Sequence, residues 1–138
     1  MVGMAYQRDL LAAYGELLSR LDAPQPSGLK HGRVLRGSCW IPGVLYDLGE
    51  YPALVPGDGQ VLGELYEVND PGLFEELDWF ETYDRGRQAA PEYVRRLIPL
   101  IEPEIEAWVY MYDRDPTGYP RVESGDWRGH VADRMRLR

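Results

Sequence analysis

The chain has 138 residues, with 23 Asp and Glu against 15 Lys and Arg, and this length suffices for one domain, expected over 1–138. A net charge of −8 argues against nucleic acid as a partner, because such binding relies on neutralising phosphates with Lys and Arg. No apolar run approaches the roughly 20 residues that span a bilayer, so we expect no membrane association and a cytoplasmic protein.

The single cysteine, Cys39, cannot form an internal disulfide, and the chain carries two histidines, His31 and His130. A catalytic thiolate would need a histidine beside it, and neither histidine stands in a recognisable motif. One cysteine and two histidines also make a poor ligand set for zinc. We therefore expect Cys39 to be a small buried hydrophobe, and we expect no metal site.

The first patterned segment is LLAAYGELLSRL, residues 10–21. Its apolar spacing fits an amphipathic helix, but Gly15 lies in the middle, where glycine destabilises a helix by about 1 kcal/mol relative to alanine. The Pro- and Gly-rich segment that follows, at 23–32, predicts a loop.

Strands are predicted on both sides of one central helix. Residues 33–68 hold four short apolar segments between Gly and Pro: RVLRGSCW, GVLYDLG, PALVPGDG and VLGELYEV. Later, EYVRRLIPLI and EIEAWVYMYDRD predict two further strands, with Pro99 marking an edge or a bulge. Large side chains on both faces of AWVYMY predict a strand buried on both sides, as in a sheet that covers itself.

The helix is predicted over about 71–81. Asn69 or Asp70 can cap its start, and Pro71 suits its first turn. These elements predict an α+β fold in which the sheet covers itself as a barrel or roll. The arginine-rich end, RGHVADRMRLR, is interpreted as a solvated tail.

One carboxylate of this helix falls on its apolar side. At about 100° per residue, Glu81 shares an arc with Leu73, Phe74, Leu77 and Phe80, whereas Glu75, Glu76 and Asp78 belong to a solvated face. A carboxylate beside apolar walls is a stronger proton acceptor, which a general base needs. The alternative is that the helix ends at Phe80, and Glu81 turns outward or pairs with Arg85, Arg87 or Arg95.

Seven segments together resemble the gamma-glutamylcyclotransferase-like superfamily, in its gamma-glutamylamine cyclotransferase-like branch. They occur in the same order as in that family and cover nearly the whole chain: Tyr14-Gly15-Glu16-Leu17, GVLYDLGEYPAL, GELYEV, LDWFETY, YVRR, AWVYMY and SGDW. The resemblance implies a small mixed β-barrel or roll with a few flanking helices, in agreement with the α+β class.

The resemblance implies a substrate-binding loop after the first strand, where the family carries Tyr-Gly-Ser/Thr-Leu. The strand would be Leu10–Tyr14, and the loop Gly15–Leu17 would bind substrate through its backbone N–H groups, with a helical segment from Leu18. Gly15 would let the main chain approach a ligand and adopt dihedrals that a side chain forbids. The implied substrate-binding residues are Tyr14, Gly15, Glu16, Leu17 and Tyr112, the last as a hydroxyl or stacking face or, alternatively, as a core aromatic.

The resemblance also implies a reaction and a base. The family's catalytic Glu follows a Leu-Asp-x-x-Glu run, and the matching position is Glu81. This residue would take a proton from the α-ammonium of a γ-glutamyl group, whose amine then attacks its own side-chain carbonyl to give 5-oxoproline and a free amine. The substrate is a small molecule and supplies the nucleophile, so no metal or cofactor is implied.

Two positions depart from the family pattern. Glu16 replaces the usual Ser or Thr, and at about 4 Å and an effective dielectric near 20 it would repel a substrate carboxylate by roughly 4 kcal/mol before screening. Thr82 replaces a common Gly. Two alternatives therefore stay open: a non-catalytic small-molecule-binding module on the same fold, and a structural interaction protein suggested by an exposed Trp79 and the basic tail.

Overall fold

The computed structural model describes residues 9–15, 33–70, 72–79 and 93–136. In these ranges the strands form one mixed sheet in the order β2-β3-β1-β5-β4. Neighbouring strands pair antiparallel except β1 and β5, which pair parallel. The strands are β1 (Asp9–Ala13), β2 (Arg33–Asp47), β3 (Pro52–Val68), β4 (Tyr93–Pro99) and β5 (Glu106–Tyr112), and the helices are α2 (Gly72–Trp79) and α3 (Trp127–Arg136). The α+β class is confirmed, and β1 agrees to within one residue with the strand implied at Leu10–Tyr14.

The four strands predicted between 33 and 68 are two long ones, which corrects that prediction. The Gly and Pro signals lie inside strands, where the register shifts between Leu35 and Gly37 and again between Pro42 and Val44. Gly43, at a φ of 146°, supplies the backbone conformation for the second shift. The chain reverses only after Asp47, where the Leu48 amide donates to the Tyr51 carbonyl at 2.9 Å.

The sheet is rolled but not closed, so the roll is confirmed and a closed barrel is wrong. Its order ends at β2 on one side and at β4 on the other. The two ends meet at an isolated bridge, where the Trp40 amide donates to the Glu102 carbonyl at 2.8 Å and the Trp40 carbonyl accepts from the Ile101 amide at 2.9 Å. Pro99 ends β4 at the sheet edge, as predicted.

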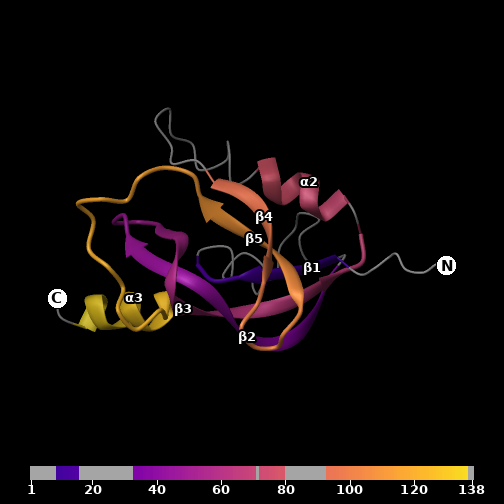
Figure 1. The fold of residues 1–138 in the computed structure, drawn as a ribbon, viewed down its shortest axis with the longest axis horizontal. Helices are drawn as coiled ribbons and strands as arrows, with labels where there is room; N and C mark the ends of the chain where they lie inside the picture. Colours follow the sequence, from indigo (N-terminus) through magenta and orange to yellow (C-terminus); the bar gives the residue numbers. More distant parts are fainter. Residues whose placement is uncertain (1–8, 16–32, 71, 80–92, 137–138) are drawn as a thin grey trace.

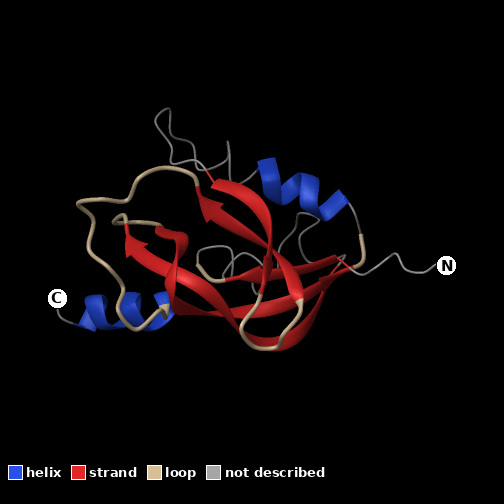
Figure 2. Cartoon of the chain, viewed as in Figure 1, coloured by secondary structure: helices blue, strands red, loops and turns tan. Residues whose placement is uncertain are grey.

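Successive residues of β1 belong to two different hydrophobic cores. Leu11 and Ala13 belong to a core that we call the α2-side core, because it includes Leu73, Phe74 and Leu77 of that helix. Ala12 and Tyr14 belong to the α3-side core, which includes Trp127. Figures 1 and 2 show the two helices on opposite sides of the rolled sheet. Strand β5 is buried from both sides, as predicted, with Val109 and Tyr110 at most 4% exposed.

Helix α2 begins where the sequence predicted it. Asp70 caps it, since its Oδ1 accepts from the Gly72 amide at 3.0 Å. Leu73, Phe74 and Leu77 are buried, so the apolar arc is confirmed. Asp78 is only partly solvated, which corrects its assignment to a solvated face, because it accepts from Tyr110 and Arg95. Pro71, Phe80 and Glu81 lie outside the described residues.

The arginine-rich end is a helix, which corrects the interpretation as a solvated tail. Asp126 caps α3, with Oδ1 accepting from the Gly129 amide at 3.1 Å. Trp127 is buried in the α3-side core and Val131 packs against it.

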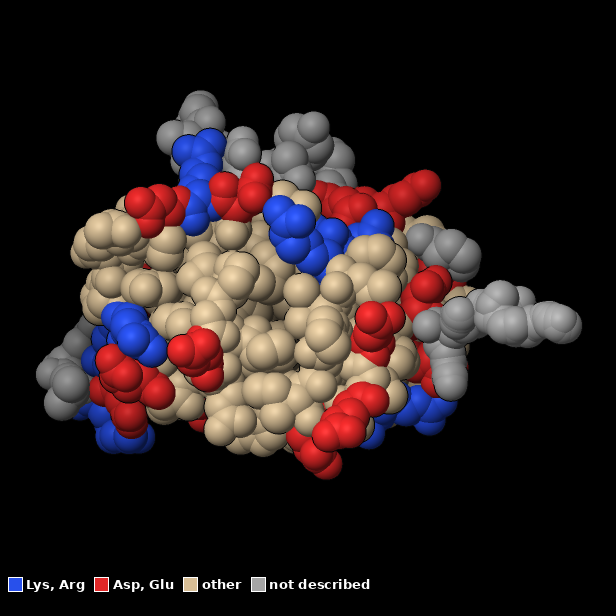
Figure 3. Space-filling view, viewed as in Figure 1, with Lys and Arg blue, Asp and Glu red and all other residues tan. Residues whose placement is uncertain are grey.

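In the described part of the chain, neither helix is long and apolar enough to cross a membrane. Figure 3 shows charged side chains of both signs around the edge of one face and uncharged residues over much of its centre.

Candidate active site

Tyr14 and Gly15 follow directly on β1 and have different surroundings. The Tyr14 ring lies in the α3-side core, and its hydroxyl donates to the Tyr110 carbonyl at 2.5 Å. Gly15 is buried and faces Pro52 at the start of β3: a Cβ on Gly15 would lie 2.4 Å from Cγ of that ring. The end of β1 therefore has two sides with different surroundings.

Gly15 is required by close packing and not by its dihedrals. The described residues with a positive φ are glycines elsewhere in the chain, so the expectation of a forbidden conformation at Gly15 is wrong. The close approach itself is present, but it is made to Pro52. A rigid proline ring cannot move aside as a flexible side chain can, so a larger residue at position 15 would displace the main chain.

Tyr112 lies on the same side as Gly15. The Tyr93 hydroxyl donates to the Pro52 carbonyl at 2.7 Å, and the Tyr93 ring lies 5.7 Å from that of Tyr112. Burial raises the pKa of Tyr112, so its hydroxyl stays protonated as a donor at neutral pH. Gly15, Pro52, Tyr93 and Tyr112 thus form a continuous group at one end of the sheet.

Helix α2 runs toward that same end. Phe74 contacts Trp108 with ring centroids 6.4 Å apart, and one turn later Asp78 Oδ1 accepts from the Tyr110 hydroxyl at 2.5 Å. A helical turn of four residues rises about 6 Å and two strand residues rise about 6.6 Å, so α2 runs parallel to β5. Since β1 is also parallel to β5, all three elements run in the same direction (Figure 1).

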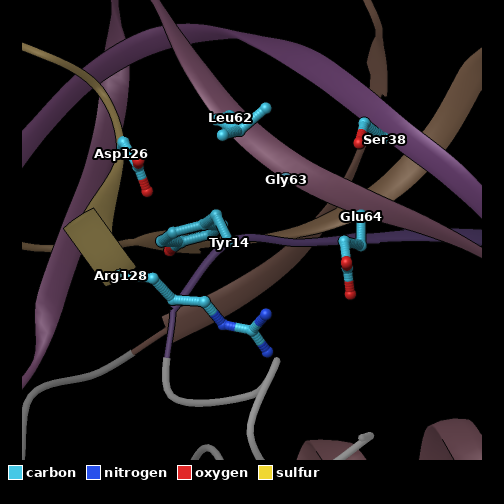
Figure 4. Close-up of a pocket in the computed structure, with 7 residues that line it drawn as sticks. All are labelled: Tyr14, Ser38, Leu62, Gly63, Glu64, Asp126 and Arg128. Carbon is cyan, nitrogen blue, oxygen red and sulfur yellow. The ribbon is translucent and has the colours of Figure 1, made fainter.

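A pocket of about 80 Å³ lies beside Tyr14 and against the start of α3. We call it the α3 pocket, and it is lined by Tyr14, Ser38, Leu62–Glu64, Asp126 and Arg128. Figure 4 shows the Arg128 side chain reaching from the start of α3 past Tyr14, toward the side where Glu64 extends from β3. The Glu64 carboxylate also accepts from the Tyr66 hydroxyl at 3.2 Å. The α3 pocket therefore combines charges of both signs.

The α3 pocket is positioned by a buried carboxylate at the end of β2. Asp47 Oδ2 accepts from Arg134 at 2.8 Å and lies 2.7 Å from Nε2 of His130, and Oδ1 accepts from the Gly49 amide at 2.7 Å. Burial alone would raise the pKa of Asp47, but these hydrogen bonds outweigh burial and hold the pKa below its ordinary value. We call these contacts of Asp47 with His130 and Arg134 the Asp47 clamp. The clamp fixes α3 to the sheet, and it thereby fixes the positions of Asp126 and Arg128.

The structure describes three of the predicted site residues: Tyr14, Gly15 and Tyr112. It brings Gly15 and Tyr112 to one side of the end of β1 and places the Tyr14 ring on the other. Glu16, Leu17 and Glu81 lie outside the described residues, as do the predicted loop at 23–32 and the helical segment from Leu18. The alternative that Glu81 pairs with Arg95 is weakened, because Nε and Nη2 of Arg95 already donate to Asp78.

The sequence reasoning missed the α3 pocket and the clamp at Asp47. Both had signals. Asp126 precedes Trp127 and Val131 at helical spacing, which is the pattern of a capped amphipathic helix. Asp47 occupies an inward position in the alternation that buries Cys39, Ile41 and Leu45, so a carboxylate there required a buried partner. Cys39 is 1% exposed, so the prediction of a buried hydrophobe is confirmed.

Comparison with known proteins identifies the family. Residues 11–129 match the family model described as gamma-glutamyl cyclotransferase, AIG2-like, and the chain belongs to this family. It is similar to the gamma-glutamylcyclotransferase family protein YtfP of Escherichia coli, with 46% identity over 83 residues, or 60% of this chain. In that comparison the chain spans 66% of the relative's length.

Solved structures agree. The solution structure of Escherichia coli YtfP matches with a TM-score of 0.61 and 35% identity, covering 91% of this chain and 99% of that one. An uncharacterized protein from Pyrococcus horikoshii matches with a TM-score of 0.65 and 25% identity, covering 93% of this chain and 97% of that one.

Within the described ranges, no three His, Cys, Asp or Glu side chains are grouped so that they could hold a metal ion.

Proposed function

We propose that the protein is a cyclotransferase that cleaves a γ-glutamyl amine or a related amide into 5-oxoproline and a free amine. Membership of the gamma-glutamyl cyclotransferase family supports this proposal. The observation that carries it is the common direction of α2, β1 and β5. Glu81 follows the last residue of α2 by two positions, and the loop 15–17 begins two positions after β1, so we infer that both lie near the ends of these parallel elements.

In the proposed reaction Glu81 is the general base. It removes a proton from the α-ammonium, and the amine nitrogen attacks the γ-carbonyl carbon to form a five-membered ring. The bond from that carbon to the leaving nitrogen then breaks. The ring nitrogen loses a second proton as the lactam forms. The leaving nitrogen takes up this proton together with the one that Glu81 returns, so the products are 5-oxoproline and the ammonium form of the amine, with no net proton change. The substrate supplies both reacting groups, so the protein must mainly fold the substrate and position it.

The residues near Gly15 have proposed positioning roles. Backbone N–H groups of the loop 15–17 would bind the oxyanion that develops on the γ-carbonyl. The Tyr112 hydroxyl, whose pKa burial raises further above neutral pH, would donate to a substrate oxygen. Packing of Gly15 on Pro52 and the bond from Tyr93 to Pro52 would hold this loop in place.

The proposal is tested by incubating the purified protein with a panel of γ-glutamyl amines and γ-glutamyl dipeptides and measuring release of 5-oxoproline. Turnover of at least one substrate is expected. If no substrate reacts but one of them raises the melting temperature, the protein is a binding module on this fold and the proposed activity is wrong. If none reacts or binds, the substrate class is wrong as well.

A further inference from the structure

The turn between β4 and β5 carries exposed apolar side chains around a groove. Leu97, Ile101 and Ile105 are 47%, 41% and 41% exposed. A shallow groove of about 430 Å³ lies at this turn, lined by residues 99–101 and 104–106. We call residues 97–106 the hairpin surface. A single exposed hydrophobic residue is normal, but several beside one groove mark an interaction surface.

The hairpin surface is acidic. Residues 97–107 read LIPLIEPEIEA and include no Lys or Arg, and Glu102, Glu104 and Glu106 are exposed. In the common view of Figures 1 and 3, acidic side chains gather at the lower edge of the molecule, where this turn lies. A carboxylate that loses water without gaining an opposite charge is costly. A partner that covers this surface must therefore bring cations together with an apolar side chain.

Backbone hydrogen bonds hold the turn in a fixed shape. The Leu100 amide donates to the Ile105 carbonyl at 2.9 Å, and the Ile105 amide donates to the Pro103 carbonyl at 2.8 Å. The Ile101 amide donates to the Trp40 carbonyl at 2.9 Å, which ties the turn to β2. Binding therefore orders little additional main chain, which lowers the entropic cost of association.

The outer side of α3 has the complementary chemistry. Arg128, Ala132, Met135 and Arg136 are exposed and recur at the spacing of one helical face. Met135 is 63% exposed, and its flexible side chain suits an irregular apolar groove. Arg136 pairs with Asp133, but its side chain is 73% exposed and within reach of a partner. The chain thus carries both an acidic apolar groove and a basic helix with an exposed apolar side chain.

We propose that the protein forms a two-fold dimer in which α3 of each copy packs on the hairpin surface of the other. Met135 occupies the groove beside Ile101 and Ile105, and Arg136 lies among the glutamates of the turn. The dimer does not depend on the proposed cyclotransferase activity.

The arrangement of the two surfaces on the molecule supports this dimer. In the view of Figures 1 and 3, α3 lies at the lower left and the turn at the lower centre, with mostly uncharged surface between them. A two-fold axis through that uncharged surface makes the contact between α3 and the turn twice. Each copy has a net charge of −8, but a Debye length of about 8 Å at physiological salt screens distant charges and leaves the contacting pairs.

Sedimentation equilibrium of the full chain tests the dimer, with a micromolar dissociation constant expected for a small interface. Glu104→Arg and Arg136→Glu should each weaken dimerisation about tenfold, because each brings like charges together in both contacts. An equimolar mixture of the two variants should restore the wild-type affinity, because both contacts of the mixed dimer then join opposite charges. Restoration also shows that both variants are folded.

Two further variants sharpen the test. Met135→Gln should weaken the dimer without any change of charge, because it removes the apolar side chain from the groove. Glu75→Arg is the control for net charge, since it changes the charge by the same amount as Glu104→Arg. It lies on α2, across the rolled sheet from α3, and should leave dimerisation unchanged.

Four results would overturn the proposal. One is a wild-type chain that stays monomeric up to millimolar concentration. A mixture that associates as weakly as the single variants would show that α3 does not meet the hairpin surface. Stronger association of Glu104→Arg by itself would mean that the turn packs on another turn. A mass that rises beyond the dimer with concentration would exclude a closed two-fold arrangement.

Discussion

Gly15 packs directly on Pro52, which lies far from it in sequence and begins the longest strand of the sheet. A Cβ at position 15 would lie 2.4 Å from Cγ of Pro52 and 3.2 Å from its Cδ. The main chain that enters the proposed substrate loop is thus held against a rigid ring. The Tyr93 hydroxyl holds the same proline in place by donating to the Pro52 carbonyl.

Gly15→Ala is expected to destabilise the protein by about 1–3 kcal/mol, because overpacking at a rigid contact displaces the backbone. Urea denaturation measures the effect. Gly72→Ala is the control, since its Cβ would come no closer than 3.4 Å to Asp70 and alanine favours a helix. In a double-mutant cycle, Pro52→Ala should recover part of the loss. A Gly15→Ala protein as stable as wild type would contradict the packing.

The clamp at Asp47 makes stability depend on pH. Hydrogen bonds from His130, Gly49 and Arg134 outweigh the effect of burial and lower the pKa of Asp47. A group with a depressed folded pKa contributes stability above its unfolded value, near 3.9, and the contribution disappears as pH falls through the folded pKa. Asp47→Asn should therefore lower the free energy of unfolding at pH 7 by about 1–3 kcal/mol, with a smaller difference from wild type at pH 3.

Urea denaturation across this pH range checks the Asp47 prediction. Asp133→Asn is the matched control, because Asp133 lies on the same helix and its pair with Arg136 is exposed. It should change stability by less than about 0.5 kcal/mol at either pH. A constant difference between Asp47→Asn and wild type from pH 7 to pH 3 would show that the carboxylate charge is not responsible.

Arg95 holds α2 against the sheet through contacts of its planar guanidinium with two aromatic rings as well as through its ion pair with Asp78. Its guanidinium lies 4.4 Å from the Phe74 ring centroid and 4.7 Å from that of Trp108, and it donates twice to Asp78. Lysine cannot reproduce a planar fork between two rings. Arg95→Lys should lower the free energy of unfolding by about 1–2 kcal/mol, whereas Arg96→Lys, the next residue on the same strand, should have little effect. Equal effects of the two substitutions would rule out a specific role for Arg95.

Cys39 should be unreactive in the folded protein. Burial, with a smaller contribution from the negative charge of Glu64, raises the pKa of the Cys39 thiol to about 12, so almost no thiolate forms at pH 8. Labelling with a maleimide should be slow in buffer and rapid in concentrated urea. A Glu123→Cys variant, placed at a side chain that is 81% exposed, should label one thiol quickly without denaturant. Rapid native labelling of wild type would mean that Cys39 is accessible.

The part of the fold that the sequence predicted best depends on local signals. Asp70 caps α2 and Leu73, Phe74 and Leu77 are buried because a cap and a helical spacing are set within a few residues. Strand ends were predicted less well. In the sequence, Gly43 indicates a turn. A register shift in a paired strand needs the same backbone conformation, and only the pairing with the neighbouring strand distinguishes the two structures.

The site was harder to predict because its contacts join distant segments. Pro52 meets Gly15, and Tyr93 meets Pro52, only once distant segments have folded together, so the resemblance could name Gly15 but not its reason. Helix α3 was misjudged because its mean composition is polar. Its stability comes from Trp127 in the core and from the Asp47 clamp, and neither is visible in the charge of the segment.

The most direct measurement of the central claim is the rate of 5-oxoproline release by Glu81→Gln, with Glu75→Gln as a control on the exposed side of α2. On a γ-glutamyl substrate that the wild-type protein cleaves, Glu81→Gln should reduce kcat by about 10²–10⁴, the contribution typical of a positioned general base. Glu75→Gln should retain the wild-type rate. If Glu81→Gln retains it as well, the residue is not the base and the account of the site is wrong.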